Sequence, residues 1–296
     1  MSKEFAPVSL ERTRDYYDVW EKTPTHTLDY TLVNLWGWQQ YFGLEWAFDG
    51  DLCWIRQTRP NTVYWAPLGA WGLDNWRDIL SGLVKEGAAS FIRIPEDLAN
   101  LWKFQAPDLV AAVEDRGQWE YIYSKEDLAS LPGPKFHKKR THVNSYIKAY
   151  GDPVYVEITP KLVEEVLGVQ DTWCQWHECA GSPSLEAENE AIARVLTHWD
   201  NFRHMYGGSL EIEGKMVAFS VGEKLDSETL GVHFEKGLNG YKGVYQVMNR
   251  EFASRAGKDF KFINRAQDMN EDGLRQAKLT YSPVGYAQKY SVSLKA

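Results

Sequence analysis

The sequence lacks any apolar run that approaches the ~20 residues a membrane-spanning helix needs. Its opening stretch, MSKEFAPVSLERTRDYYD, is charged throughout and has no apolar core of the kind a secretory signal carries. Positive charge is in deficit, with 33 Lys and Arg against 41 Asp and Glu. We therefore expect a cytoplasmic protein without a transmembrane segment, in which any nucleic-acid contact needs a local basic patch.

Cysteine is also scarce. The three residues Cys53, Cys174 and Cys179 are too few for a disulfide framework and suit a reducing compartment. The stretch from Cys174 to Cys179 includes His177 and so contains three side chains of metal-binding type. Its spacing is not that of a CxxC pair, and no second ligand pair accompanies it. The prediction is no metal, with ordinary helix packing favoured over a zinc site.

What the sequence does contain is typical of a globular protein, with 44% hydrophobic and 25% charged residues in 296. Tryptophan is unevenly spread, because ten of the 13 precede residue 135. This imbalance favours two domains with different cores. The tryptophans of the first half indicate an aromatic core, with a surface for stacking sugars or bases as the alternative.

Short strands and helices alternate along the first half. Asp49-Gly50 lies between two aromatic, β-prone runs and predicts a hairpin over 44–58. The stretch Leu131-Pro-Gly-Pro134 predicts a rigid break between secondary-structure elements, so we expect domains at 1–134 and 135–296. The other expected elements before it are a helix over 75–86, a strand over 90–95, a mostly helical stretch over 96–115 and a strand over 118–123.

The second half predicts the element order β-α-α-β-β-β-α-β-α-β and contains neither a Rossmann fingerprint nor a Walker loop. By analogy, this order is that of the GNAT acyltransferases. We therefore predict an α+β fold of tandem GNAT-like domains, with mixed sheets flanked by helices. The loop Gly240-Tyr-Lys-Gly243 precedes a helix, where that fold presents backbone N–H groups to the donor. A plain turn is the alternative.

Four stretches, residues 132–144, 214–222, 233–253 and 263–284, together resemble the phosphatidylglycerol lysyltransferase C-terminal domain family, most closely its small members of unestablished role. The resemblance implies tandem GNAT-like architecture and kinship with Fem-type aminoacyltransferases. It also implies transfer of an aminoacyl group from a charged tRNA, to a lipid headgroup in the membrane-bound enzymes and to a cell-wall precursor in the Fem type. The membrane half of the lipid enzymes is missing here, so a lipid acceptor is less expected. Ala266 replaces the family's Glu, and Thr141 stands where Asn is common.

Three residues are candidates for catalysis: His233, Glu235 and Tyr281. His233 and Glu235 alternate with Val232 and Phe234 at a strand end, so we expect them to share one face. Either is a candidate base or acceptor contact, and a solvated strand end is the alternative. Tyr281 is a candidate general acid for the leaving group, although most tyrosines simply pack.

Two further groups of residues are candidates for binding. The predicted donor site combines the glycine loop with a polar cluster that would hold a carboxylate or phosphate of the donor through its arginines. The alternative for this cluster is a purely structural salt bridge between Asp268 and Arg275. The basic stretch after residue 134 is predicted to bind phosphate groups. It is too short to contact more than the acceptor end of a tRNA. The alternative is that it forms a solvated helix face. The donor-binding residues are Tyr241, Lys242, Gly243, Asn264, Arg265, Asp268, Arg275 and Lys278, and the phosphate-binding residues are Lys135, His137, Lys138, Lys139 and Arg140.

The predicted function is transfer of an acyl or aminoacyl group to an amine or hydroxyl of a small-molecule or cell-envelope acceptor. The co-substrate is aminoacyl-tRNA or acyl-CoA, without a tightly bound cofactor. A non-catalytic GNAT-like module that binds a ligand or partner is the alternative, and Ala266 is the residue that supports it.

Overall fold

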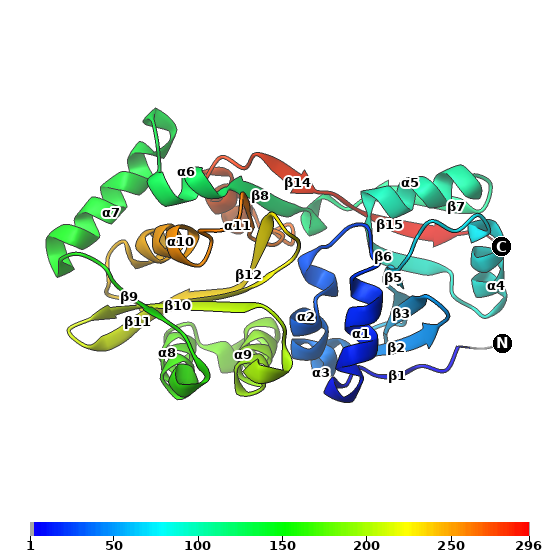
Figure 1. Cartoon of the computed structure of the whole chain (residues 1–296), viewed down its shortest axis with the longest axis horizontal. Coiled ribbons are helices and arrows are strands. Elements are labelled where there is room, and N and C mark those ends of the chain that lie inside the picture. Colours follow the sequence, from blue (N-terminus) through cyan, green and yellow to red (C-terminus); the bar gives the residue numbers. More distant parts are fainter. Residues whose placement is uncertain (1–2, 296) are drawn as a thin grey trace. The chain divides into compact units, whose positions relative to one another are not determined.

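The computed structural model describes residues 3–295, which form two compact units. The first unit contains the chain up to Glu120, residues 267–270 and the chain from Ala287 onward. The second contains Tyr121–Ala266 and Glu271–Tyr286. Each unit is an α+β structure built on one mixed sheet with helices against it (Figure 1).

The sheet of the first unit has the order β1-β2-β3-β4-β6-β15-β7, with β5 paired to β3. Its core contains five completely buried tryptophans, so the tryptophan enrichment of the first half reflects a core. These are Trp46, Trp54, Trp65, Trp76 and Trp102. The strands are β1 (Ala6–Pro7), β2 (Leu44–Asp49), β3 (Leu52–Gln57), β4 (Val63–Tyr64), β5 (Leu68–Gly69), β6 (Ser90–Pro95), β7 (Val110–Glu114) and β15 (Lys289–Leu294), and the helices are α1 (Thr13–Trp20), α2 (Leu32–Gly37), α3 (Gln39–Phe42), α4 (Trp76–Lys85) and α5 (Glu96–Gln105).

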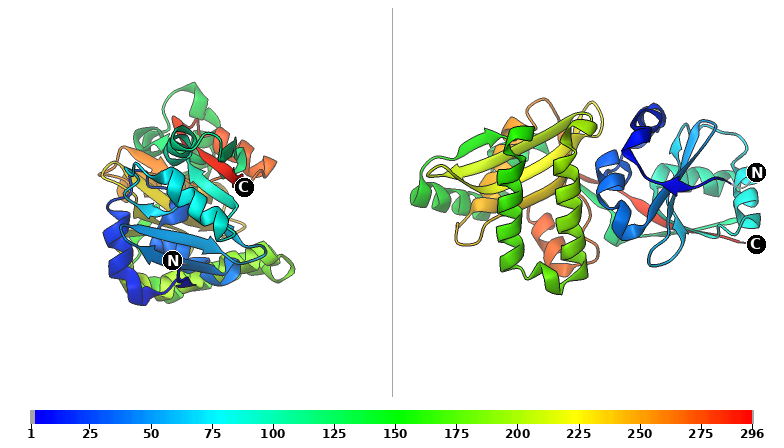
Figure 2. Two further views of the ribbon diagram at one scale, coloured as in Figure 1. Left: turned by 90° about the vertical axis from the view of Figure 1, so that its right-hand side faces the viewer. Right: turned by 90° about the horizontal axis from the view of Figure 1, so that it is seen from below.

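The sheet of the second unit has the order β14-β8-β13-β12-β11-β10-β9. Helices α6, α7 and α10 lie on one face, whereas α8 and α9 lie side by side on the other (Figures 1 and 2). The strands are β8 (Glu120–Ser124), β9 (Val154–Glu157), β10 (Met205–Ile212), β11 (Lys215–Lys224), β12 (Thr229–Gly237), β13 (Phe262–Asn264) and β14 (Gly285–Ala287), and the helices are α6 (Lys125–Ser130), α7 (His137–Tyr150), α8 (Val163–Trp176), α9 (Pro183–Thr197), α10 (Val244–Arg255) and α11 (Asp272–Leu279). Short 3-10 turns span Leu10–Arg12, Leu28–Tyr30, Arg116–Gln118, Pro134–Phe136, Pro160–Leu162, Cys179–Gly181 and Trp199–Asn201.

The two halves of the chain exchange their last strands. β8 follows β7 in sequence but lies between β13 and β14 of the second sheet. β15 follows β14 in sequence but lies between β6 and β7 of the first sheet, where Val292 pairs with both Phe91 and Ala112. Each sheet is therefore completed by a strand from the other half.

This exchange explains why the compact units do not divide at the 134/135 junction expected from the sequence. The chain leaves the first unit at Glu120, and residues 125–150 form α6 and α7 of the second. Leu131 and Phe136, beside the Pro-Gly-Pro turn, are buried in the core cluster of that unit. The turn joins the two helices α6 and α7 within one unit. Proline and glycine indicate that the chain changes direction, and they do not indicate whether a domain ends there.

The local predictions held where turns or periodicity were strong. The hairpin over 44–58 forms as β2 and β3, with Gly50 in the left-handed region at φ +61°. The helical prediction over 96–115 was wrong in its second part. Helix α5 ends at Gln105, and residues Val110–Glu114 form the edge strand β7. Strands are recognised in a sequence by apolar residues that alternate with polar ones. In this strand the apolar Val113 is 69% exposed, so the strand does not follow that pattern.

The sequence did not predict a disulfide, yet two of the three cysteines are paired. Cys174, near the end of α8, and Cys179 form a disulfide. Glu178 adopts a left-handed conformation at φ +50°, which turns the chain so that Cys179 comes back beside α8. The two sulfur atoms that would bind zinc as thiolates are therefore bonded to each other. The His177 ring stacks on Trp173 with 4.0 Å between ring centroids.

Candidate functional site

The candidate site lies in the second unit, where β12 and β13 diverge. Their parallel pairing covers only Thr229–Gly231 against Phe262–Asn264. Beyond Gly231, β12 continues along β11 to Gly237. Beyond Asn264 the chain turns away through Ala266, which adopts a left-handed backbone at φ +57°. Such divergence of two central parallel strands exposes the side chains on both to a common space.

His233 and Glu235 do not share a face, contrary to the prediction from alternation. The β11–β12 register shifts between Val221 and Gly222, which leaves His233 as the extra residue of a bulge. Cross-strand partners lie on the same face, so Glu235 lies on the face of its partner Ser220.

The ring of His233 turns to the opposite face. Its Nε2 lies 2.7 Å from Glu223 Oε1, and both side chains are about 95% buried. Lys236 reaches α9 and α8 from that same face, through Glu188 and the Trp173 ring. His233 is thus part of the packing under α8 and α9, and Glu235 belongs to the α10 side.

Glu235, Arg265 and Tyr281 form one polar group at the point where the strands diverge. Arg265 Nη2 donates to Glu235 Oε1 at 2.8 Å, and the guanidinium also hydrogen-bonds the Tyr281 hydroxyl. Burial opposes the charge on Arg265, but Glu235 keeps its pKa above the usual value. Burial raises the pKa of Tyr281 to about 12, so that its hydroxyl keeps a proton at neutral pH.

Lys139 completes this group from α7. Its Nζ lies 3.8 Å from the centroid of the Tyr281 ring. Burial, together with the charge of Arg265, lowers the pKa of Lys139 to about 8. The pairing of a raised tyrosine pKa with a lowered lysine pKa in one place is typical of sites that move protons.

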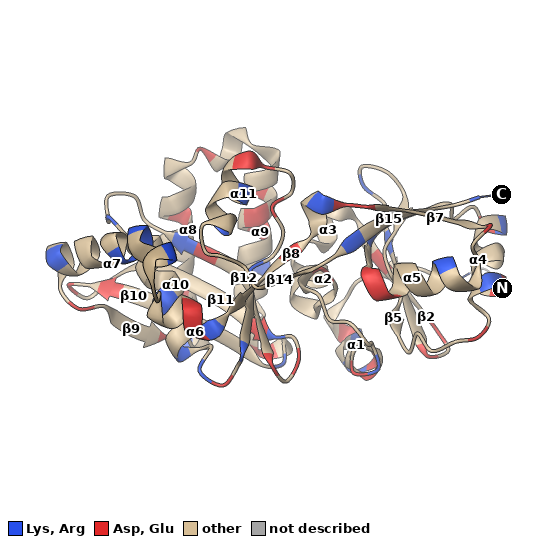
Figure 3. Ribbon diagram, turned by 90° about the horizontal axis from the view of Figure 1, so that it is seen from above, with Lys and Arg blue, Asp and Glu red and all other residues tan. Residues whose placement is uncertain are grey.

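A pocket of about 310 Å³ opens beside Lys139. One wall is the basic face of α7, where Lys and Arg gather in Figure 3, and the other is the turn after α11. The lining residues are Lys135, Lys138, Lys139, His142, Leu279, Thr280 and Ser282. The pocket therefore combines a positive wall with hydroxyl groups, a suitable environment for an anion.

The basic stretch divides its residues between this pocket and structural contacts. Lys135 lines the pocket and also pairs with Asp127 at 2.7 Å. Arg140 points elsewhere, because its Nη1 donates to the carbonyls of Leu131 and Gly133 and so holds the turn between α6 and α7. His137 is exposed at the start of α7 and is not among the pocket residues.

The predicted donor loop, Gly240–Gly243, is supported from behind by α7. The Tyr150 hydroxyl accepts the N–H of Lys242 at 3.4 Å and donates to the carbonyl of Gly240 at 3.1 Å. Gly243, at φ +82°, has no room for a side chain, since a Cβ there would lie 2.4 Å from the carbonyl oxygen of His142. Tyr241 and Lys242 line a second pocket of about 320 Å³ at the start of α10.

Two members of the polar cluster predicted around Arg265 contact the backbone beside it. Lys278 Nζ hydrogen-bonds the carbonyls of Arg265 and Ala266, and Asn264 Oδ1 accepts the Ala266 N–H at 3.0 Å. These two residues therefore fix the backbone that carries Arg265. Arg275 lies on α11 and is half-buried.

Asp268 is assigned to the first unit. It is completely buried in the first unit, where it pairs with Arg116 at 3.2 Å and accepts the N–H of Asn270. The donor-binding role of Asp268, like its alternative salt bridge to Arg275, stays a prediction. Asp268 lies three residues after Arg265, and residues 267–270 belong to the first unit.

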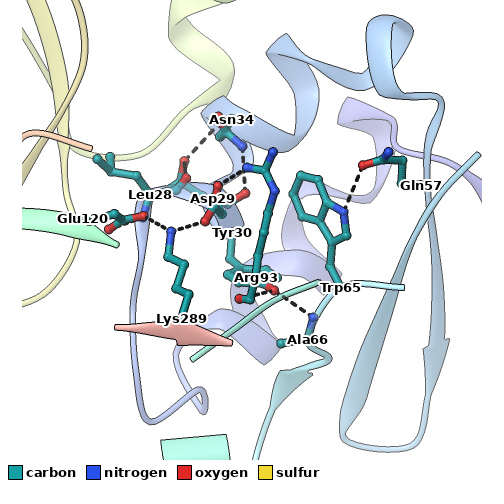
Figure 4. Close-up of polar contacts among 11 residues, drawn as sticks. Leu28, Asp29, Tyr30, Asn34, Gln57, Trp65, Ala66, Arg93, Glu120 and Lys289 are labelled. Atoms are coloured by element: carbon teal, nitrogen blue, oxygen red, sulfur yellow. Dashed lines mark hydrogen bonds and ion pairs between the residues drawn. The ribbon is translucent and has the colours of Figure 1, made fainter. Parts of the chain in front are cut away.

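The first unit has a corresponding divergence that is filled by its own side chains (Figure 4). β4 pairs in parallel with β6 only at Tyr64 and Phe91. Beyond that pair, the Tyr30 hydroxyl accepts the N–H of Ala66 at 2.7 Å and donates to the carbonyl of Arg93 at 3.0 Å. One phenol thus satisfies backbone groups on both strands. No signal in the sequence marked Tyr30 for this role.

Beside this closure lies a buried network of charges (Figure 4). Asp29 contacts both Lys289 and Arg93, and Lys289 also contacts Glu120 at 2.5 Å. Asp29, Lys289 and Glu120 are at most 2% exposed, whereas the Arg93 side chain is 13% exposed. With this opening bridged and these charges paired internally, the described residues of the first unit offer no counterpart of the group around Arg265.

Neither a metal centre nor a membrane span emerges from residues 3–295. In that part of the chain, no three His, Cys, Asp or Glu side chains gather closely enough to hold an ion. None of its helices has both the length and the apolar character needed to cross a bilayer.

The family model described as phosphatidylglycerol lysyltransferase, C-terminal, matches residues 20–293. The chain belongs to this family. A conserved protein of unknown function from Bacteroides thetaiotaomicron has a solved structure that is 30% identical, with a TM-score of 0.89, covering 99% of this chain and 100% of that one. A curated relative, an uncharacterised protein of Mycoplasmoides gallisepticum, is 21% identical over 179 residues, or 59% of this chain, and the chain spans just over half (56%) of its length.

More distant members and neighbours of the lysyltransferase family share the fold. The structure of L-PGS from Bacillus licheniformis gives a TM-score of 0.66 at 13% identity, over 97% of this chain and 92% of that one. The structure of FemX gives 0.60 at 10% identity, over 97% and 96%. The tandem GNAT-like fold predicted from the sequence is thereby confirmed.

Proposed function

We propose that the second unit transfers an aminoacyl group from a charged tRNA to an amine or hydroxyl of a small-molecule or cell-envelope acceptor. The observation that carries this proposal is the group of Glu235, Arg265 and Tyr281 beside the basic pocket. An ester carbonyl placed there meets a buried guanidinium that stabilises developing negative charge. Tyr281, with its hydroxyl protonated at neutral pH, is the acid for the leaving oxygen.

The donor loop supports aminoacyl-tRNA over acyl-CoA. A coenzyme pyrophosphate at this loop would need its backbone N–H groups. The N–H of Lys242 is already bonded to Tyr150, and His142 backs Gly243. The terminal phosphates of a tRNA, in contrast, fit the positive wall of the pocket on α7. Family membership supports the same choice, and we place the activity in the cytoplasm, where charged tRNA is found.

Transfer from radiolabelled lysyl-tRNA, compared with labelled acetyl-CoA, tests the proposal on the full chain. We expect transfer from the tRNA and binding that weakens steeply between 50 and 200 mM salt, by ~10³-fold if about six phosphate contacts form. Arg265→Ala should reduce transfer by at least ~100-fold. Arg255→Ala is the matched control, because Arg255 pairs with Glu251 on α10 and takes no part in the site.

Three results would contradict the proposal. Transfer from acetyl-CoA alone would replace the donor. Full activity of Arg265→Ala would exclude the site. Binding of tRNA without turnover for any acceptor would favour the non-catalytic module, with Ala266 in place of the family's glutamate as its basis.

A further inference from the structure

The proposed transfer needs a base, and four residues of the second unit are candidates. Glu235 is held by Arg265 at 2.8 Å, so its carboxylate is committed to a buried ion pair. His233 faces α8 and α9 and bonds Glu223. Tyr281 retains its proton, because burial raises its pKa to about 12. Of the basic residues that line the pocket, Lys135, Lys138 and His142 are exposed, whereas Lys139 is half-buried against the Tyr281 ring and is the remaining candidate.

The surroundings of Lys139 suit that task. Among residues 3–295 no carboxylate pairs with it, and its amine lies over the Tyr281 ring on the wall of the 310 Å³ pocket. The pocket and charge partners around it are cations or neutral: Lys135 from the 3-10 turn before α7, Lys138 and His142 from α7, and Arg265 from the segment after β13. The carboxylate of the polar group, Glu235, is paired with Arg265, and Asp127 is paired with the pocket residue Lys135.

We propose that Lys139 is the base of the transfer and that the acceptor is a primary amine carried by an anionic molecule. This inference rests on the proposed function. Positive walls repel an ammonium ion, so an amine enters this pocket in its neutral form or loses its proton there. The same walls attract a phosphate or carboxylate attached to that amine.

The step balances as follows. The acceptor nitrogen attacks the ester carbonyl and forms the C–N bond, while its proton passes to the neutral amine of Lys139. The C–O bond of the ester breaks, and Tyr281 gives a proton to the departing oxygen, which leaves as the tRNA hydroxyl. Lys139 then returns its proton through water to the tyrosinate, and both groups are restored.

The first experiment measures the protonation of Lys139 without any transfer assay. The full chain is acetylated with trace acetic anhydride between pH 6 and 11, and mass spectrometry follows each lysine-containing peptide. Lys148, exposed on the same helix, is the reference. We expect Lys139 to become reactive near pH 8, well before Lys148. Equal midpoints for the two lysines would overturn the proposal.

The second experiment measures transfer from labelled lysyl-tRNA to O-phosphoethanolamine, glycine and ethanolamine. Both anionic amines should be used at least 10-fold better than ethanolamine, with a rate that rises through pH 8. Lys139→Ala should lose that rise and at least ~100-fold in kcat, and added methylamine should restore part of it. Lys139→Arg should not restore it, since arginine keeps its proton. Lys148→Ala should match the parent protein.

The outcomes separate this inference from the proposed function. Transfer that persists in Lys139→Ala with an unchanged pH profile excludes Lys139 as the base and leaves the proposed function standing. Equal use of ethanolamine and the two anionic amines excludes the acceptor class. Absence of transfer to every acceptor overturns the proposed function, and with it the role of Lys139.

Discussion

Arg265 donates to Glu235 from the segment after β13, and this 2.8 Å contact connects that segment to β12 beyond the point where the pairing of β12 and β13 ends. Beyond Gly231 and Asn264 no backbone ladder connects β12 to β13 in the described chain, so side chains take over that connection. The ion pair therefore stabilises the fold, in addition to the role in transfer proposed above. Stability measurements distinguish the two.

A double-mutant cycle should show strong coupling between these residues. Their side chains are only 11% and 17% exposed, so removing one partner leaves a poorly solvated charge. We expect Glu235→Gln and Arg265→Met each to cost roughly 3–5 kcal/mol in urea unfolding, and the double variant to cost less than their sum. The exposed pair Arg77 and Asp108 should show little coupling, and equal coupling in both pairs would contradict the assignment.

Tyr30→Phe should destabilise the first unit without disturbing the second. The lost hydroxyl leaves the N–H of Ala66 and the carbonyl of Arg93 without this partner, at a cost of roughly 2–4 kcal/mol for two buried groups. Tyr41→Phe is the control, because Tyr41 is 42% exposed and should change the unfolding free energy little. Hydrogen exchange should locate the loss in β4 and β6, and a uniform loss across both units would disagree.

The buried network should make the first unit sensitive to acid. Burial favours neutral Asp29, but Lys289 and Arg93 hold its pKa below the ordinary value of 3.8. A depressed pKa contributes stability that is present above pH 3.8 and disappears as the pH falls through the folded-state value. Asp29→Asn should therefore be destabilised by roughly 3–5 kcal/mol at pH 7 and by much less at pH 2, as measured by urea titration.

A matched control accompanies that measurement. Asp51 pairs with Lys22 on the surface, so Asp51→Asn should leave the unfolding free energy at pH 7 almost unchanged. If Asp29→Asn proves as harmless as Asp51→Asn, the network does not stabilise the fold.

Ending the chain after Gln288 should open the first sheet. β15 pairs with β6 on one side and β7 on the other, and Lys289 leaves with it. We expect hydrogen-exchange protection to collapse in β6 and β7 and to persist in β11 and β12. A synthetic peptide of residues 287–296 should restore it. Undiminished protection in β6 would mean that the exchanged strand is dispensable.

Sequence reasoning identified the chemistry of the site better than its geometry. Arg265, Glu235, Tyr281 and Lys139 were each predicted, but in three separate roles, because β12, β13, α7 and the turn after α11 meet only in the folded unit. His233 was misplaced because alternation assumes an unbroken ladder, and one bulged residue reverses the face of everything beyond it. The fold class followed from element order, which survives such local errors.

The exchange of strands was invisible for a related reason. The side-chain pattern of β8 or β15 states which residues are buried and says nothing about which strands lie beside it. Proline and glycine at 131–134 marked a real turn. The pairing of β8 with β13, which includes Tyr123 with Ile263, shows that the chain has already entered the second sheet before that turn.

That exchange has a consequence for synthesis on the ribosome. Domains commonly fold in the order in which they emerge. Here the first sheet has a vacant position between β6 and β7 until residues 289–294 have been made, although β6 was finished almost 200 residues earlier. The edges of β6 and β7 that later pair with β15 therefore stay unpaired while the whole second unit is synthesised. We expect a nascent chain in that state to bind chaperones that shield open strand edges.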